Sequence, residues 1–225
     1  MSGTITALVA QKKNKDRVNV FLDGQFVFGL AAIEAIRLKR GQVLSDADID
    51  RLRGADEVEK AHHRALNFLA VRPRSISEVR QNLKKAEVSP DVIEQVIDRL
   101  QRADLLNDAE FIKYWLENRS AFSPRSSRAL KQELMRKGVD REAIDQVLGE
   151  VKHDEEGAAT RSALAKANRF KQLPQKEFAL KLSQYLARRG FGYEIIREAV
   201  AAAWRSIHAA EAEASIDQPF DELEE

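Results

Sequence analysis

Basic side chains gather in three stretches of this sequence, about 51 residues apart, and such clusters can bind phosphate groups. Residues 72–86 and 124–138 each carry five bases against one acid, a net charge of +4, and residues 174–190 reach +3. The segment after each stretch is acidic: residues 88–98 and 139–150 have a net charge of −3 and residues 191–203 of −1. Exposed helix faces are charged in any case, but ordinary solvated faces would mix the two signs. The threefold segregation favours a basic ridge that contacts a phosphate backbone without reading bases.

The side chains expected to form this ridge all belong to the second helix of a predicted repeat, or to the turn before it. The predicted nucleic-acid- or filament-binding residues are Arg72, Arg74, Arg80, Lys84, Lys85, Arg125, Arg128, Lys131, Arg136, Lys137, Lys181, Arg188 and Arg189.

Residue types needed for other chemistries are missing or wrongly spaced. The chain has no cysteine, so it has no disulfide, no thiolate nucleophile and no cysteine metal site. Asp46, Asp48, Asp50 and Glu57 imitate a calcium loop, but Arg51 stands where that loop needs glycine. We therefore interpret these acids as partners of a helix dipole, at a helix start capped by Ser45.

The remaining polar motifs do not point to catalysis either. His62 and His63 are adjacent and diverge on a helix, while His153 and His208 are isolated, so no metal spacing results. No glycine-rich loop ends in Gly-Lys-Ser or Gly-Lys-Thr, so no nucleotide cradle is expected. We predict a binding protein with no cofactor and no metal, and not an enzyme.

An internal repeat positions the basic stretches. Residues 73–98 share nine identities with the 26 positions that lie 51 residues further on, among them Pro73-Arg74-Ser75 and Pro124-Arg125-Ser126. A third, degenerate copy follows at an offset of 52, which aligns Gly138 with Gly190. Repeats of this length are typical of stacked helical units, because one unit alone cannot bury its apolar face.

Local signals define the helices of each repeat. Ser75-x-x-Glu78 predicts a capping box, and Ser89-Pro90 and Ser123-Pro124 predict two further helix starts. Gly138 and Gly190 are expected to end helices. One apolar face recurs in the third helices: Val92, Ile93, Val96, Ile97 and Leu100; Ala143, Ile144, Val147, Leu148 and Val151; Ile195, Ile196, Ala199, Val200 and Ala203.

Three aromatic residues, Phe111, Tyr114 and Trp115, stand at the start of the second repeat. We expect them to pack at the junction between repeats. Base stacking is the functional alternative for these rings.

The first thirty residues predict strands rather than helices. Alternating apolar residues over 4–11, 17–22 and 25–29 are separated by polar turns, and Asp23-Gly24 suits a two-residue hairpin turn. A three-stranded meander is expected, followed by helices over 46–53 and from residue 56 to about 71. Such a small sheet must pack on other elements.

These elements predict a mainly α protein in which tandem three-helix repeats form a short curved solenoid after the β-meander. The expected boundaries are 1–55 for the N-terminal part, 56–104, 105–152 and 153–208 for the repeats, and 209–225 for a disordered acidic tail. The tail holds seven acids and no base, whereas residues 1–208 hold 37 bases against 29 acids, a balance of +8. The tail is either a solvated segment that keeps the protein in solution, or a competitor of a polyanion for the basic surface. No apolar run of about 18 residues occurs, so we expect no membrane span and a cytoplasmic location.

The ordered set of these motifs resembles the RecX family of recombinase regulators. The resemblance rests on Arg72-Pro73-Arg74-Ser75-x-x-Glu78-Val79-Arg80 with Leu83-Lys84-Lys85, on Leu105-Leu106-Asn107-Asp108-x-x-Phe111, on Glu117-Asn118-Arg119, and on Leu134-x-x-Lys137-Gly138-Val139. The strand Ile5-Thr6-Ala7-Leu8 with Asp23-Gly24 is similar to an extension of longer members. The resemblance covers roughly residues 4–205. Asn107 departs from the family pattern, where an acid is commoner, and the third repeat carries few of the motifs.

Membership would imply three tandem three-helix units and binding to the RecA filament on DNA. It would also imply modulation, usually inhibition, of the ATPase, strand-exchange and coprotease activities of RecA, and hence a part in recombination, DNA repair and the SOS response. The family has no catalytic residues. We expect a monomer that binds single- and double-stranded DNA without sequence specificity.

Two other readings of the sequence stay open. A stand-alone DNA-binding regulator would use one unit as a helix-turn-helix, and it predicts dimers and a discrete site. A protein-binding helical scaffold predicts affinity with little salt dependence.

Overall fold

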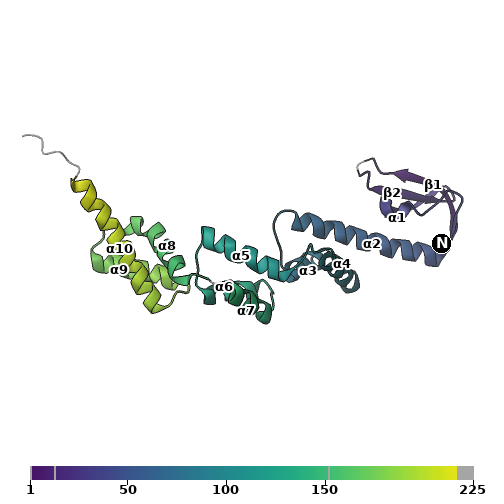
Figure 1. Ribbon diagram of the computed structural model, residues 1–225. Helices are drawn as coiled ribbons and strands as arrows, with labels where there is room; N and C mark the ends of the chain where they lie inside the picture. Colours follow the sequence, from purple (N-terminus) through teal and green to yellow (C-terminus); the bar gives the residue numbers. More distant parts are fainter. Residues whose placement is uncertain (1, 13, 152, 217–225) are drawn as a thin grey trace, which may run out of the picture. The chain divides into compact units, whose positions relative to one another are not determined.

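The computed structural model describes residues 2–12, 14–151 and 153–216, and side chains up to residue 209. The chain divides into two compact units between Asn107 and Asp108. Each unit is described by itself below, with the labels of Figure 1.

The first unit begins with an antiparallel sheet of order β3-β2-β1-β4. Its strands are β1 (Gly3–Ala10), β2 (Arg17–Leu22), β3 (Gln25–Ala31) and β4 (Val43–Leu44). Leu22 pairs with Gln25 across the hairpin, and both turn residues have positive φ, 48° at Asp23 and 84° at Gly24. This is the tight turn that the Asp-Gly pair predicts. The expected three-stranded meander was incomplete, because β4 adds a fourth strand beside β1.

One long helix, α2 (Asp46–Leu69), joins the sheet to the first repeat. Its first half packs with α1 (Ala32–Ala35) and the sheet, where Ile49 and Leu52 are buried. Its second half packs on α3 (Ile76–Lys84) and α4 (Pro90–Arg102) through Ala61 and Ala65. Figure 1 shows the strands along one half of α2 and the two shorter helices along the other.

The prediction of two helices over 46–53 and 56–71 was therefore wrong. Gly54 lies inside α2, and the helix continues through it without interruption. The expected boundary between residues 55 and 56 falls within this helix. Asp56, at that position, is 3% exposed and accepts from the Ala31 amide at 3.0 Å and from the Arg17 guanidinium at 2.9 Å. A buried carboxylate with these partners fixes α2 against the sheet.

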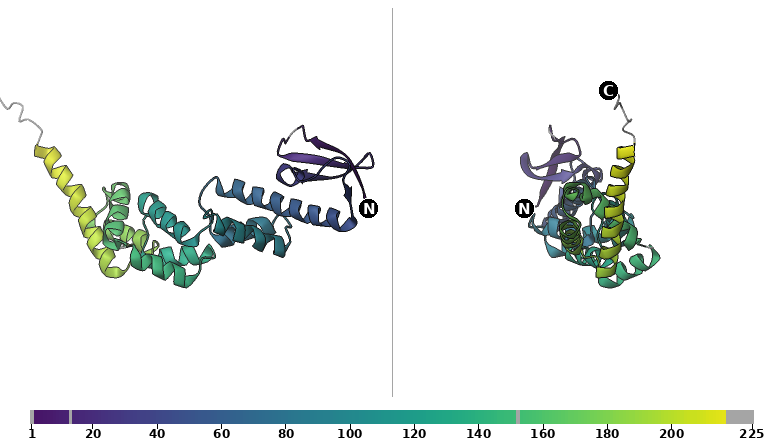
Figure 2. Two further views of the ribbon diagram at one scale, coloured as in Figure 1. Left: turned by 45° about the vertical axis from the view of Figure 1, so that its right-hand side comes forward. Right: turned by 90° about the vertical axis from the view of Figure 1, so that its left-hand side faces the viewer.

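The second unit contains two three-helix groups. The first comprises α5 (Asp108–Phe122), α6 (Ser127–Arg136) and α7 (Arg141–Glu150). The second comprises α8 (Glu155–Ala167), a 3-10 turn (Asn168–Phe170), α9 (Gln175–Ala187) and α10 (Tyr193–Ile216). Figure 2 shows α10 alongside α8 and α9 and continuing past them. Residues 209–216 thus extend α10, in contrast to the disordered tail that we expected from residue 209; residues 217–225 lie outside the described part.

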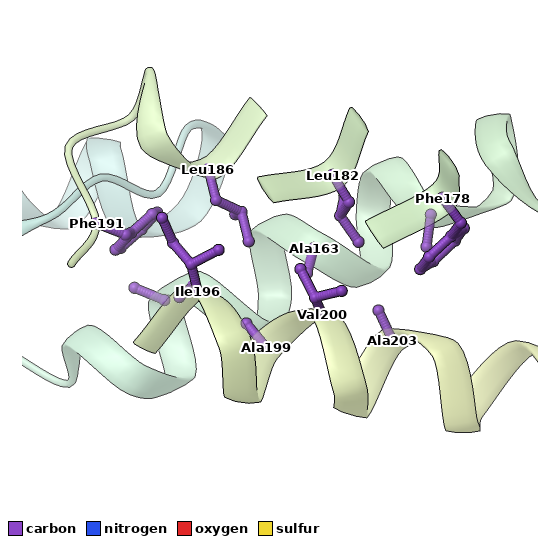
Figure 3. Close-up of a cluster of buried hydrophobic side chains, with 12 residues drawn as sticks. Ala163, Phe178, Leu182, Leu186, Phe191, Ile196, Ala199, Val200 and Ala203 are labelled. Atoms are coloured by element: carbon purple, nitrogen blue, oxygen red, sulfur yellow. The ribbon is translucent and has the colours of Figure 1, made fainter. Parts of the chain in front are cut away.

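The predicted apolar face forms the core of the last group. Figure 3 shows Ile196, Ala199 and Val200 of α10 opposite Leu182 and Leu186 of α9. In the first repeat the whole set Val92, Ile93, Val96, Ile97 and Leu100 is buried. In the second repeat the last expected member, Val151, is 38% exposed, because α7 ends at Glu150.

Two other details of the second unit differ from expectation. The start of α6 is capped by Ser126, whose side chain accepts from the Ala129 amide, and not by Ser123. Ser126 is the repeat equivalent of the Ser75 cap, so the repeat placed this helix start better than the Ser-Pro pair. Phe111 and Trp115 pack in the core of their own group rather than at a junction between repeats.

Candidate nucleic-acid interface

The thirteen predicted basic residues fall into three sets with different surroundings. Six are exposed, and among the described residues no hydrogen bond, ion pair or ring contact engages their charged groups. These six free cations are Lys84, Lys85, Arg128, Arg136, Lys181 and Arg188.

Three of the free cations occupy the same place in successive repeats. The offsets of 51 and 52 align Lys85, Arg136 and Arg188, and each lies at the C-terminal end of its group's second helix. A cation there is stabilised by the negative end of the helix dipole. The recurrence of these three cations thus has a structural cause. Because they are exposed, they can also bind an anion.

A second set is paired with carboxylates. Arg80 donates two hydrogen bonds of 2.9 Å to Glu94, and Lys131, its repeat equivalent, pairs with Asp145, the equivalent of Glu94. The bonds from Arg80 lower the pKa of Glu94. In both repeats the pair ties the second helix to the third. The basic and acidic helices of the sequence therefore partly neutralise each other within a repeat.

The other two paired arginines lie at the turns that precede the second helices. Arg72 donates to both carboxylate oxygens of Glu78, at 3.0 and 3.2 Å, and Glu78 in turn belongs to the capping box of α3. Arg125 lies 2.8 Å from a carboxylate oxygen of Glu133. Each of these side chains is a third exposed or less.

A third set is stacked on aromatic rings. The guanidinium of Arg74 lies 4.0 Å from the centroid of Phe68, and the ammonium of Lys137 lies 5.1 Å from that of Trp115. Arg189 stacks 4.7 Å from Tyr185 and donates to the Pro124 carbonyl at 2.9 Å. Such cations contribute to packing as well as to the surface potential.

The structure brings four of the predicted arginines together around one concave site of about 530 Å³ in the second unit. The lining of this site, which we call the arginine pocket, consists of Arg125, Arg128, Ala129, Gln132, Glu133, Arg136, Ala187, Arg188, Gly190 and Phe191. Among the described residues, its lining thus holds four arginines and one acidic residue. The predicted residues of the first unit, Arg72 to Lys85, belong to a separate unit.

Glu133, the one carboxylate among the described residues that line the arginine pocket, is already engaged. It accepts from the Trp115 indole at 3.0 Å and from Arg119 at 2.8 Å, besides its ion pair with Arg125. Only 14% of its side chain is exposed. Because Arg119 and Arg125 already balance the charge of Glu133, this carboxylate does not cancel the charge of Arg128, Arg136 and Arg188.

The walls of the arginine pocket come from two repeats that are joined by hydrogen bonds. The Ser126 amide donates to the Arg189 carbonyl at 3.2 Å, and Arg189 donates to the Ser123 hydroxyl at 3.1 Å. On the other side of α6, Glu155 accepts from the amide and the hydroxyl of Ser127, at 3.1 and 2.8 Å. The bonds of Arg189 hold the end of α9 against the start of α6, and those of Glu155 hold the start of α8 there.

The sequence pattern did not reveal Glu133, Arg119 or Trp115 as parts of this site. One signal was present: the repeat equivalent of Glu133 is Asn82, so the second repeat gains a carboxylate where the first has an amide. Asn82 instead accepts a hydrogen bond of 3.1 Å from Arg64.

The acids that imitate a calcium loop lie on helix α2, in the described part of the chain. No cluster of three or more metal-ligating side chains occurs there. Asp48 forms a capping box with Ser45, whose hydroxyl lowers the pKa of Asp48, as expected for an acid at a helix start. Within the same residues, no helix combines the length and the apolar character that crossing a membrane needs.

This fold defines a class of small helical-repeat proteins, in which three three-helix units follow an N-terminal β-sheet. Four family models match the chain in order: the Regulatory protein RecX N-terminal domain over residues 3–45, and the first, second and third three-helix domains of RecX over residues 61–100, 107–148 and 154–200. The chain belongs to the RecX family of regulatory proteins.

Individual relatives agree with this assignment. The chain is similar to the regulatory protein RecX of Bacillus subtilis, with 36% identity over 202 residues that cover 87% of this chain and 75% of the relative. It is also similar to that of Listeria monocytogenes, with 32% identity over 210 residues, 92% of this chain and 78% of the relative.

Solved structures show the same fold. A crystal structure of regulatory protein RecX superposes with a TM-score of 0.69 at 25% identity, over 87% of this chain and 97% of that one. The structure of RecX from Lactobacillus salivarius gives a TM-score of 0.56 at 25% identity, over 66% of this chain and 97% of that one.

Proposed function

We propose that this regulatory protein acts on the RecA recombinase, by binding the RecA–DNA nucleoprotein filament and lowering its ATPase, strand-exchange and coprotease activities. The family assignment supports a regulatory role. The observation that carries the proposed mode of binding is the set of six free cations, which recur on the second helices of all three repeats. Exposed cations without local partners are available to DNA phosphates, with no preference for sequence.

The protein contributes no chemistry of its own in this proposal. It works as a non-enzymatic, cytoplasmic monomer, and any change in ATP hydrolysis arises in the recombinase. Its paired and stacked cations keep the repeats in shape, while the free cations contact the phosphates.

The decisive experiment measures ATP hydrolysis by RecA on single-stranded DNA, with and without this protein. The protein is added to preformed filaments, in which the DNA is already occupied. We expect hydrolysis to fall at far less than one protein per RecA subunit, because a molecule bound in the filament affects several subunits. The protein alone should hydrolyse no ATP.

Two results would contradict this proposal. Inhibition only at amounts that cover the bare strand would indicate simple competition for DNA. No response of preformed filaments, together with tight binding to naked DNA, would indicate a stand-alone DNA-binding protein.

A further inference from the structure

The arginine pocket between the second and third repeats presents three guanidinium groups that have no partner among the described residues. They are those of Arg128 and Arg136 on α6 and of Arg188 at the end of α9. Like charges gathered in this way repel one another, and an anion between them relieves that repulsion. The charge and the concave shape together indicate a site for an anionic group.

The spacing of the arginines suits a chain of anions better than a single ion. Arg128 and Arg136 are eight residues apart on one helix, which corresponds to roughly 12 Å along its axis. Gln132 lies between them, and its exposed amide can donate a further hydrogen bond. One DNA strand carries a phosphate about every 3.4 Å of helix axis. The pocket is therefore long enough for two or more successive phosphates.

The composition of the lining favours a phosphate backbone over an acidic peptide. Protein partners bury apolar and aromatic side chains at the centre of an interface. The arginine pocket offers alanine and glycine, and its one aromatic residue, Phe191, is 5% exposed and belongs to the core. Guanidinium groups, by contrast, match the paired oxygens of a phosphate.

The pocket is also built before any ligand arrives. Gly190 lies directly against Ser126, and Arg189 bonds to the turn before α6, so the distance from Arg188 to α6 is fixed. Glu133 is held by two hydrogen-bond donors, Trp115 and Arg119, and by its ion pair with Arg125, so its charge is already engaged. Little ordering is needed on binding, which favours affinity.

We propose that the arginine pocket is a phosphodiester-binding site that holds consecutive phosphates of one nucleic-acid strand between Arg128, Arg136 and Arg188. This inference rests on the proposed function, which it deepens by assigning the strand contact to one pocket. The paired Arg125 serves as a positioning residue in the floor.

The test uses the full-length protein with three glutamine substitutions, Arg128→Gln, Arg136→Gln and Arg188→Gln. The probe is a fluorescent oligothymidine, titrated over a range of salt concentrations. For a single strand the slope of log K against log salt is negative, and each lost phosphate contact reduces its magnitude by about 0.7. We expect the magnitude of the slope to fall by roughly 2. The corresponding lysine variant should keep most of the slope, because it keeps the charges, but should bind several-fold more weakly than the unsubstituted protein.

A matched control removes the same charge from elsewhere in the unit. Arg141, Arg161 and Arg197 are exposed and lie beside carboxylates rather than in the arginine pocket. Replacing these three by glutamine should change the slope much less. Equal changes in both variants would show that only net charge matters, and would overturn the proposal.

Two further outcomes separate this inference from the proposed function. If the pocket variant keeps the DNA slope but no longer inhibits RecA, the pocket contacts protein and not phosphate; the inference then fails while the proposed function stands. The inference also fails if polyglutamate displaces the labelled oligothymidine from the protein as well as unlabelled oligothymidine of equal length does. If DNA binding is lost and circular dichroism shows an intact helical fold, the phosphate site is supported.

Discussion

Gly190 lies so close to Ser126 that a β-carbon on this glycine would come within 2.5 Å of the serine hydroxyl. The same atom would lie 2.9 Å from the β-carbon of Ala129, and the backbone at Gly190 has φ of +91°. The second and third repeats therefore meet at a point where only glycine fits. Because Ser126 also caps α6, this contact links the repeat junction to the folding of a helix.

Replacing Gly190 by alanine should destabilise the second unit by about 2 to 4 kcal/mol, from positive-φ strain and steric overlap together. Thermal unfolding followed by tryptophan fluorescence can measure this loss, since both tryptophans, Trp115 and Trp204, lie in that unit. Gly192→Ala is the matched control, because nothing lies within 4 Å of that position and its φ is not positive. Equal stabilities of the two variants would contradict the close contact.

Glu133 is the second point on which the arginine pocket depends. Replacing it by glutamine removes the charge that Arg119 and Arg125 share, and leaves these cations without a counter-ion. We expect a loss of about 2 to 4 kcal/mol in the free energy of unfolding, and a shift in the emission of Trp115. The control is Glu94→Gln, where 60% of the carboxylate side chain is exposed and the loss should stay below about 1 kcal/mol. Similar losses for both variants would argue against a stabilising ion-pair cluster around Glu133.

His62 should make the first unit sensitive to acid. Partial burial lowers its pKa below the ordinary value of 6.5, and nearby Arg99 adds to this. The unfolded chain therefore binds a proton more readily than the folded chain, so stability is complete above about 6.5 and falls as the pH drops through the lowered pKa. His62→Gln should flatten the stability profile below about pH 6.5.

Urea unfolding followed by far-ultraviolet circular dichroism gives the profile of His62→Gln. The variant His208→Gln, in the other unit, controls for the loss of a histidine. A slope that persists in His62→Gln would assign the acid sensitivity to other groups.

Much of this fold could be predicted from the sequence, because local signals decide it. The Asp23-Gly24 turn, the capping box at Ser75 and the glycine ends at Gly138 and Gly190 each depend on a few neighbouring residues. The apolar face of α4 was likewise predicted in full. Long-range contacts could not be read in this way. The two-residue strand β4 has no pattern of its own, and it forms only because β1 offers a free edge.

The candidate site was predicted in part, for the same reason. Charge counting found the basic helices, but it could not distinguish Arg80, which lies beside Glu94, from Lys84, which is free. That distinction depends on how two helices pack. Similarly, the burial of Asp56 and the two donors and one ion-pair partner of Glu133 follow from tertiary distances that sequence spacing does not contain.

The acids at the end of the chain should weaken DNA binding at low salt. Residues 217–225 carry five acids and no base. These acids repel DNA phosphates over a Debye length of about 30 Å at 0.01 M salt but only about 8 Å at 0.15 M. Deleting these residues should tighten binding to oligothymidine several-fold at about 0.01 M and have little effect at about 0.15 M. A variant with each acid changed to its amide separates charge from length. Equal affinity of all three proteins at low salt would leave these residues only a solubilising role.

The free and paired cations of the first repeat provide the sharpest test of which side chains contact phosphate. Lys84 and Lys85 are exposed and engage no described partner, whereas Arg80 donates two hydrogen bonds to Glu94. Changing both lysines to glutamine should lower the salt slope of binding to duplex DNA by roughly 1.8, since each lost phosphate contact lowers it by about 0.9. Arg80→Gln should leave the slope unchanged and lower the free energy of unfolding by less than about 1 kcal/mol, as for other exposed ion pairs. If Arg80→Gln lowers the slope as much as one lysine substitution does, the pair with Glu94 opens on DNA. The continuous basic ridge predicted from the sequence would then be the better description of the interface.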